Sequence, residues 1–333
     1  MKKISRRNFL KVSGAMAAAG ALAACGGSGA STPAASGAAS TSTAASAAAA
    51  GEDKFASLGD FTMTVGHAQP EGNPRFVSME QFAADVAEAT NGHVKIEVYG
   101  NGQLGTEKEM LEQVVAGTVQ GMRGGQFDFS PRLLMFTLPF LTNTRAQVTA
   151  LLQSDLAQKV CAEAEGETGT VIINLCDAGG YRQFSNSKHP IKAPADLKGL
   201  KTGVEDGQEN PWVNVEGMKL YEVQKYFTEV NYQFHPDPFY VNAAWWNGLP
   251  EEYRDIITEC ATKMGEYNDE LIDKNSSAAK QTIVDYGCEV YEPSADELKA
   301  FQTAVQSVYD QCVTEGICTA DEIKEMQDIV AKA

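Results

Sequence analysis

The chain has 333 residues, of which 44 are acidic and 27 are basic, and its formal net charge at pH 7 is −17. This negative charge excludes nucleic acids and anionic lipid headgroups as general binding partners, because both are themselves negatively charged. About 275 residues follow the N-terminal segments, which is long enough to form two lobes with sizeable cores.

Residues 1–25 are predicted to be an export signal. Arg6 and Arg7 precede an apolar run rich in Ala and Gly, a pattern typical of twin-arginine signals. The run ends in Leu-Ala-Ala-Cys, which indicates a lipoprotein processing site with Cys25 as the lipidated residue. The alternative is a cleaved secretory peptide in which Cys25 has no role. We expect an exported, membrane-anchored lipoprotein that faces the periplasm or the cell exterior.

Residues 26–54 are predicted to be a flexible linker. The stretch 26–50 contains only Gly, Ser, Ala, Thr and Pro, a composition that cannot build a core. A stretch of this length has an r.m.s. reach of roughly 25–30 Å, so a folded domain could stand off from a bilayer. The signal contains five basic residues and no acidic ones, so the mature chain has 22 basic and 44 acidic residues, a net charge of −22. An anionic solute would therefore need a local arginine or a helix terminus.

The folded part is predicted to be α/β. Alternating apolar residues from Phe61 to Val65 and from His93 to Tyr99 indicate two strands, and a helical pattern lies between them. Such a β-α-β unit should place its strands in parallel. Capping boxes predict helices that start after Thr106, Ser294 and Thr319, and one long helix is expected from Glu251 to about Tyr286.

The cysteines are less informative. Six follow Cys25, an even number that permits disulfides in an exported protein, but six cysteines allow fifteen pairings and no spacing favours one of them. No Cys-x-x-Cys motif is present, and we expect neither a metal nor a cofactor.

A polar motif, Asp206-Gly207-Gln208-Glu209-Asn210-Pro211, stands out in the second half of the chain. It predicts a turn around Gly207, followed by a helix with Asn210 as N-cap and Pro211 in the first helical position. Apolar residues at helical spacing follow, among them Trp212 and Met218. The N-terminus of such a helix favours an anionic ligand.

Together with Lys219-Leu220-Tyr221-Glu222-Val223-Gln224-Lys225, this motif resembles the signature of one family. The family comprises the extracytoplasmic solute receptors of tripartite ATP-independent periplasmic (TRAP) transporters. The resemblance extends over residues 60–310, in the family's usual order. It includes Leu138-Pro139-Phe140-Leu141, Ser185-Asn186-Ser187-Lys188 and Asp196-Leu197-Lys198-Gly199-Leu200-Lys201.

The resemblance implies an α/β, two-lobed fold like that of periplasmic binding proteins, of the TRAP receptor type, with a long connecting helix. Lobe I would comprise residues 55–179 and 236–275, and lobe II residues 180–235 and 276–333. The receptor would capture a small organic-acid solute through its carboxylate and deliver it to the membrane subunits of a TRAP permease, without chemistry.

The resemblance also implies binding residues. Arg182 matches a family arginine that contacts the substrate carboxylate, a role that suits the guanidinium fork. Asn210 matches a position whose amide reaches the ligand. Two weaker candidates come from the pattern of residues: His67 ends the first strand and faces the crevice where open α/β sheets bind ligands. Gln126 lies in a Gly-rich stretch suited to a binding loop.

One departure from the family follows Lys201. Roughly thirty residues, about one βα unit with its return, are predicted to be missing there, and with them the principal carboxylate-binding arginine. That arginine's position falls on Thr202 or is absent. The second lobe is therefore expected to be truncated and binding to be weakened. Lys201 or Arg123 could compensate as cations.

Three alternative functions remain. An exported hydrolase is disfavoured because neither Gly-x-Ser-x-Gly nor His-Glu-x-x-His is present and the four histidines are scattered. The binding protein of an ATP-driven importer would use the same physics, but residues 206–211 argue against it. The third alternative is a deletion variant with impaired binding.

Overall fold

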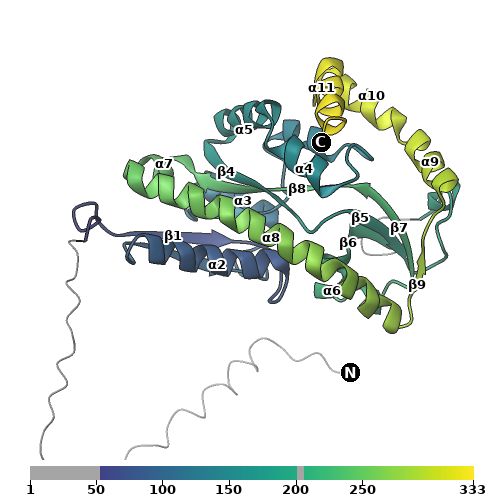
Figure 1. Ribbon diagram of the computed structural model, residues 1–333, viewed down its shortest axis with the longest axis horizontal. Helices are drawn as coiled ribbons and strands as arrows, with labels where there is room; N and C mark the ends of the chain where they lie inside the picture. Colours follow the sequence, from purple (N-terminus) through teal and green to yellow (C-terminus); the bar gives the residue numbers. More distant parts are fainter. Residues whose placement is uncertain (1–52, 201–205) are drawn as a thin grey trace, which may run out of the picture. The chain divides into compact units, whose positions relative to one another are not determined.

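The computed structural model describes residues 53–200 and 206–333 (Figure 1). In these residues five strands form one sheet in the order β2-β1-β3-β8-β4. Its members are β1 (Phe61–Gly66), β2 (Val94–Tyr99), β3 (Gly121–Arg123), β4 (Thr170–Asp177) and β8 (Pro236–Asn242). The strands β1, β2 and β3 run parallel, whereas β8 is antiparallel to both β3 and β4.

A second sheet has the order β6-β5-β7-β9. It consists of β5 (Arg182–Asn186), β6 (Gly207–Pro211), β7 (Tyr226–Gln233) and β9 (Glu289–Tyr291). The strand β5 is antiparallel to both β6 and β7, and β7 is parallel to β9. The chain passes from the first sheet to the second between β4 and β5 and returns between β7 and β8.

The helices cover both sheets. They are α2 (Pro74–Ala89), α3 (Glu107–Val115), α4 (Arg145–Leu152), α5 (Asp155–Thr168), α6 (Trp212–Gly217), α7 (Ala243–Asn247), α8 (Glu251–Asp285), α9 (Ala295–Ala304), α10 (Gln306–Thr314) and α11 (Ala320–Val330). Short 3-10 helices occupy Pro131–Thr137, Pro194–Leu197 and Leu220–Glu222. Within the described ranges no helix combines the length and the apolar character that a membrane crossing needs.

The elements with a strong local pattern are confirmed. The strands β1 and β2, which precede and follow α2 in the sequence, pair in parallel as the β-α-β pattern predicts. Side-chain capping boxes at Thr106, Ser294 and Thr319 open α3, α9 and α11. The predicted long helix is α8, which ends one residue before the expected position at Tyr286.

The helix α8 contacts the cores of both sheets. Its first half contributes Tyr253 and Met264 to a cluster under the first sheet, alongside α2 (Figure 1). Its last turns contribute Ala279 and Ile283 to a cluster with α6 and β7. Burial of these apolar side chains is the main force that holds the sheets to the helix. The predicted α/β architecture with a long connecting helix is thus confirmed.

The division into lobes stays a prediction. Its boundaries at 179/180 and 235/236 fall between strands of different sheets. The boundary at 275/276 falls inside α8, and Cys312 and Met326 from the last two helices pack in a core cluster with Leu133 and Tyr240 of the first sheet's side.

The Asp206–Pro211 motif does not form the predicted turn and helix cap. Residues 207–211 are the strand β6, paired with β5, and α6 begins only at Trp212 with Pro211 as its N-cap and no side-chain cap bond. Met218, predicted to face the core, is 43% exposed. Pairing with β5 engages one side of the backbone along all of residues 207–211, whereas a cap at Asn210 would engage only the N–H groups of one helix start.

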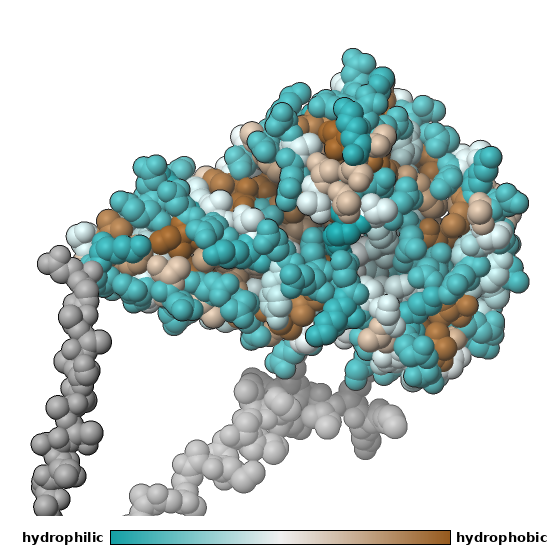
Figure 2. Space-filling model, in the orientation of Figure 1, coloured by the Kyte–Doolittle hydropathy of each residue, from teal (hydrophilic) through white to brown (hydrophobic). Residues whose placement is uncertain are grey.

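The surface agrees with the composition. On the face shown in Figure 2, hydrophilic residues predominate and hydrophobic residues occur in separate small patches. Such scattered apolar residues are normal for a protein surface and mark no particular site.

Candidate functional site

Arg182 begins β5, directly after the crossing from the first sheet to the second. Its guanidinium binds the neighbouring strand through Glu209: the Nε and Nη2 atoms both donate to the Glu209 carboxylate, with Nη2–Oε1 at 2.9 Å. Nη2 also donates to the Glu209 carbonyl oxygen at 2.7 Å. The side chain of Arg182 is 15% exposed and that of Glu209 is 33% exposed. The ion pair is therefore partly open to solvent.

Two further side chains border this pair. Tyr232 on β7 interacts with both partners, and its pKa is raised above the usual phenol range, first by burial and then by the Glu209 carboxylate. The pKa of His235 is lowered to about 4, first by burial and then by the positive charges of Arg182 and Arg75. His235 is therefore neutral at pH 7.

His235 connects the arginine to the Gly-rich stretch of the first sheet's side. Its ring stacks on Phe127 with centroids 5.0 Å apart and an interplanar angle of 23°. A Cβ on Gly125 would lie 2.7 Å from the His235 ring, so only glycine fits there. Gln126 lies between Gly125 and Phe127 in the sequence, and its carbonyl oxygen accepts a hydrogen bond from Tyr240 at 3.0 Å. The structure thus brings the Gln126 loop near Arg182 through one imidazole ring.

His67 lies at the end of β1, and its ring is fully buried. Nδ1 accepts a hydrogen bond from the backbone N–H of Gln69 at 3.2 Å, whereas Nε2 has no hydrogen-bond partner. Burial, and then the charges of Arg75 and Arg123, lower the pKa of His67 to about 3. His67 is accordingly a neutral, enclosed ring that packs edge-on against Phe76.

Arg123 is committed to another partner and is not available as a compensating cation. It is fully buried, with Nε 2.8 Å from Oδ2 of Asp237, and Arg75 places its own Nε at the same distance from that oxygen. Arg123 also donates to the Ser78 hydroxyl at 3.0 Å and to the Asp177 carbonyl at 3.1 Å. Lys201, the other candidate, lies outside the described residues, as do Thr202 and Cys25.

Asn210 does not join Arg182. In the β5–β6 register it lies opposite Gln183, whereas Arg182 lies opposite Pro211. Directly opposed residues share a face of a sheet and successive residues alternate, so the two side chains lie on opposite faces. The Asn210 amide donates to Oε1 of Gln208 at 2.5 Å.

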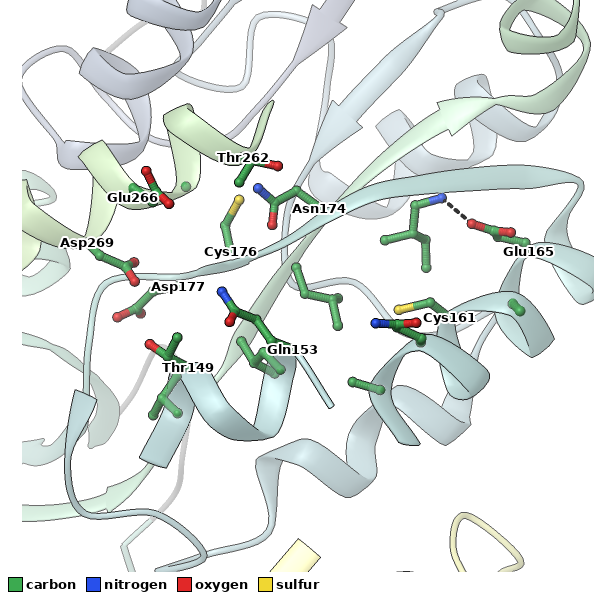
Figure 3. A pocket seen from close by; sticks show the side chains of 18 residues that line it. Thr149, Gln153, Cys161, Glu165, Asn174, Cys176, Asp177, Thr262, Glu266 and Asp269 are labelled. Carbon is green, nitrogen blue, oxygen red and sulfur yellow. Dashed lines mark hydrogen bonds between the residues drawn. The ribbon is translucent and has the colours of Figure 1, made fainter. Parts of the chain in front are cut away.

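A separate cavity of about 460 Å³ lies between α4, α5, β4 and α8 (Figure 3). It contains none of the predicted site residues, and its polar walls include Glu165, Glu266, Asp177 and Asp269. Burial, reinforced by the nearby Asp177, raises the pKa of Asp269 to about 6. This concentration of acids disfavours a carboxylate ligand. The arrangement at Arg182, which already holds a carboxylate, suits one better.

Three residues of the Arg182 site were not predicted from the sequence: Glu209, Tyr232 and His235. Glu209 belongs to the motif at 206–211, but its role depends on the partner strand. Tyr232 and His235 carry no local signal: Tyr232 reaches Arg182 through the β5–β7 pairing, and His235 follows two residues after the end of β7.

The fold and the site together define a class: two sheets bridged by a long helix, with a partly exposed arginine fork where the chain crosses between them. Comparisons with known proteins agree. The chain belongs to the DctP family, bacterial extracellular solute-binding proteins of family 7, whose family model matches residues 65–205 and 199–315. It is a TRAP-type solute-binding receptor, as predicted. A twin-arginine translocation signal matches residues 3–23 and confirms the predicted export signal.

Three similar proteins illustrate the relationship. A solute-binding protein of Chromohalobacter salexigens is 27% identical over 295 residues, which is 78% of this chain and 87% of the relative. The 2,3-diketo-L-gulonate-binding periplasmic protein YiaO of Escherichia coli is 25% identical over 82% of this chain and 94% of its own length. The fold resembles the sugar acid binding protein DctPAm of Advenella mimigardefordensis in complex with galactonate, with TM-score 0.77, 20% identity, and coverage of 83% and 99% of the two chains.

Proposed function

We propose that this receptor captures a small organic acid through its carboxylate, with Arg182 as the anchor. The observation that carries the proposal is the arginine fork at the sheet crossing, which already binds a carboxylate side-on. A fork of this kind forms two parallel charge-assisted bonds to a carboxylate. Two similar proteins are named for sugar acids, 2,3-diketo-L-gulonate and galactonate, which supports a hydroxylated or keto acid as the solute.

The contact between Glu209 and Arg182 indicates how a solute carboxylate would bind. Its carboxylate occupies the two donor positions that a solute carboxylate would use, and one third of its side chain is exposed. The solute carboxylate would exchange with Glu209 on Arg182, and Glu209 would rotate into solvent. This exchange keeps the guanidinium paired in both states, which avoids leaving a partly buried charge without a partner.

The Gln126 loop would meet the solute from the first sheet's side. Gln126 is half-buried, and its side chain reaches back only to the backbone N–H of Phe127 at 3.1 Å. Turning this amide toward a solute hydroxyl would sacrifice one local bond. In the structure His67 is enclosed, and Asn210 lies on the opposite face of the sheet from Arg182. A solute contact for these two residues stays a prediction.

The proposal includes delivery of the solute to the membrane subunits of a TRAP permease and assigns no chemical step to the receptor itself. Reconstitution with such a permease in vesicles would give solute uptake only when the receptor is added. Recovery of a chemically altered solute after incubation with the receptor alone would instead support the hydrolase alternative.

We also propose that the exported chain is a lipoprotein anchored at Cys25. Processing would leave this cysteine as the lipid-modified N-terminus, and the composition of residues 26–50 would let the receptor reach away from the bilayer. Cells supplied with a labelled fatty acid should incorporate the label into the wild type but not into Cys25→Ser. Equal labelling of both proteins would contradict the anchor.

The shortened stretch after Lys201 remains part of the proposal. With one carboxylate-binding arginine instead of two, affinity should be roughly thirty-fold to several thousand-fold weaker. Calorimetric titration of the mature receptor with galactonate, glucuronate and succinate tests this, with galactose as the neutral control. Millimolar carboxylate should bind and galactose should not. Absence of heat with every acid would contradict the proposed function.

A further inference from the structure

The last two helices bring two cysteine sulfur atoms together. Cys312 lies on α10 and Cys318 lies just before α11, and their Sγ atoms are 2.8 Å apart. Both residues are buried, at 6% and 2% exposure. Among the described residues no other pair of cysteine sulfurs is in contact; Cys161, Cys176, Cys260 and Cys288 each lie apart from the rest.

The backbone holds this approach in place. After α10 ends at Thr314, Gly316 adopts a left-handed conformation with φ 73°, which reverses the chain. The N–H groups of Ile317 and Cys318 then both donate to the carbonyl oxygen of Cys312, at 3.0 and 3.4 Å. The two sulfurs therefore face each other because of the helix-terminating turn, and no backbone movement is needed to bring them close.

The compartment favours a covalent bond between them. The twin-arginine signal directs the chain out of the cytoplasm, into surroundings where disulfides form and persist. We propose that Cys312 and Cys318 form a disulfide in the exported receptor. The two thiols lose two protons and two electrons, and the electrons reduce the disulfide of a thiol–disulfide oxidant, which leaves as a dithiol. The first cysteine forms a mixed disulfide with the oxidant, and the second displaces it.

The bond would close the turn from Cys312 to Cys318, here called the corner. This corner holds the C-terminal helix α11 to the first sheet's side. Arg132 donates to the Ile317 carbonyl oxygen at 3.1 Å and pairs with Glu322 of α11 at 2.8 Å. Beyond the corner, Met326 packs in the core cluster of the first sheet's side. A disulfide at this position restricts the unfolded chain and keeps the corner closed when α11 frays.

Burial sets the kinetics of the reaction. It raises the pKa of Cys318 to about 12, so that little thiolate exists in the closed corner at neutral pH. The same burial keeps an external thiol away from the two sulfur atoms, so exchange in either direction requires the corner to open. We expect the bond to resist reductant in the folded receptor and to break readily in denaturant.

Peptide mapping gives a direct test. The exported full chain is denatured in excess N-ethylmaleimide without reductant and digested with trypsin. Both cysteines fall in the peptide of residues 300–324. The disulfide predicts an unalkylated peptide lighter by two hydrogen atoms than its reduced form, while peptides with Cys176 or Cys288 carry the label. A doubly alkylated 300–324 peptide, or one joined to another cysteine, would overturn the proposal.

Variants supply the second measurement. The double variant Cys312→Ser, Cys318→Ser should melt several degrees below the wild type, and prior reduction in denaturant should no longer shift its Tm. Cys288→Ser is the matched control, because that half-buried thiol hydrogen-bonds to the Tyr221 and Gln224 carbonyl oxygens and has no contact with Cys312 or Cys318 among the described residues. The control should keep the redox-dependent shift. A wild-type Tm that is the same before and after full reduction would contradict the proposed bond.

Discussion

Two arginine–carboxylate groups, one beside each sheet, have the same chemistry but different surroundings. Arg123 and Arg75 share Asp237, with both Nε–Oδ2 distances at 2.8 Å, and Arg123 and Asp237 are completely buried. Arg182 pairs with Glu209 beside the sheet crossing, where both side chains keep some contact with solvent. The first group is closed to any other partner while the chain is folded, whereas the second is the one at which we propose that a solute carboxylate exchanges with Glu209.

The comparison shows why residue type alone did not separate the structural Arg123 from Arg182, the proposed solute anchor. A buried charge without its partner carries a large desolvation cost, so Arg123 is held where it stands. A partly exposed pair contributes little to stability, so Arg182 can change partners at small cost. Three predictions test this distinction, and a fourth tests His67, whose pKa the charges of Arg75 and Arg123 help to lower.

The largest effect is expected on stability, from Arg123→Met. The substitution leaves Asp237 with one cation instead of two and removes the donors to Ser78 and Asp177. The free energy of unfolding should fall by about 3–5 kcal/mol, as for other buried pairs that lose one partner. Urea denaturation measures it. Arg182→Met is the control and should lose less than about 1 kcal/mol; equal losses in the two variants would erase the distinction.

The second prediction concerns solute binding. Arg182→Ala should weaken galactonate or succinate binding by about 2–5 kcal/mol, because it removes both charge-assisted bonds to the carboxylate. Calorimetry on the mature receptor measures the loss. Arg182→Lys keeps the charge but not the fork and should fall between wild type and Ala. Undiminished binding in the Ala variant would remove Arg182 from the site.

How far the sequence could predict these features depends on the range of the interactions. The β1–α2–β2 unit and the capped helices follow from periodicity and capping within a few residues of chain. The strand β6 could not be predicted, because Asn210 and Pro211 locally favour a cap and only the distant partner β5 makes them a strand. Likewise, Arg123 looked available because its partner Asp237 lies more than a hundred residues away in the sequence.

The third prediction is a pH dependence set by His67. Its pKa is lowered to about 3 in the folded receptor, against the ordinary histidine value of 6.5. Between these two values His67 is protonated in the unfolded chain and neutral in the folded chain. Stability is therefore full above pH 6.5 and declines on acidification, by about 2 kcal/mol at pH 5 from this residue. His67→Gln should remove that part of the decline, as measured by urea denaturation at pH 7 and pH 5.

The matched control for His67 is His189→Gln, an exposed histidine on the second sheet's side. Its decline on acidification should equal that of the wild type. Asp269, whose pKa is raised to about 6, works in the opposite direction in this pH window, but it contributes equally to every variant and cancels in the comparison. An unchanged pH dependence in His67→Gln would mean that this ring is protonated or exposed in the folded state.

The smallest expected effect comes from Glu209→Gln, which tests whether Glu209 competes with the solute. The substitution keeps the size of the side chain but removes the charge that pairs with Arg182. If the solute carboxylate must displace Glu209, affinity should rise by about 1 kcal/mol, roughly five- to tenfold. Glu229→Gln changes a carboxylate of β7 that is paired with Lys280 and not with Arg182, and it should leave affinity unchanged.

The direction of the Glu209→Gln effect separates two roles for the ion pair. A competitor raises affinity when it is neutralised, and the gain should shrink as salt screens the pair in the wild type. A positioning residue lowers affinity when it is neutralised, because Arg182 then loses the contact that orients its fork. Calorimetry at low and high salt distinguishes the two. Weaker binding by Glu209→Gln at both salt concentrations would show that Glu209 supports the site, and exchange of carboxylates on Arg182 would then have to be abandoned.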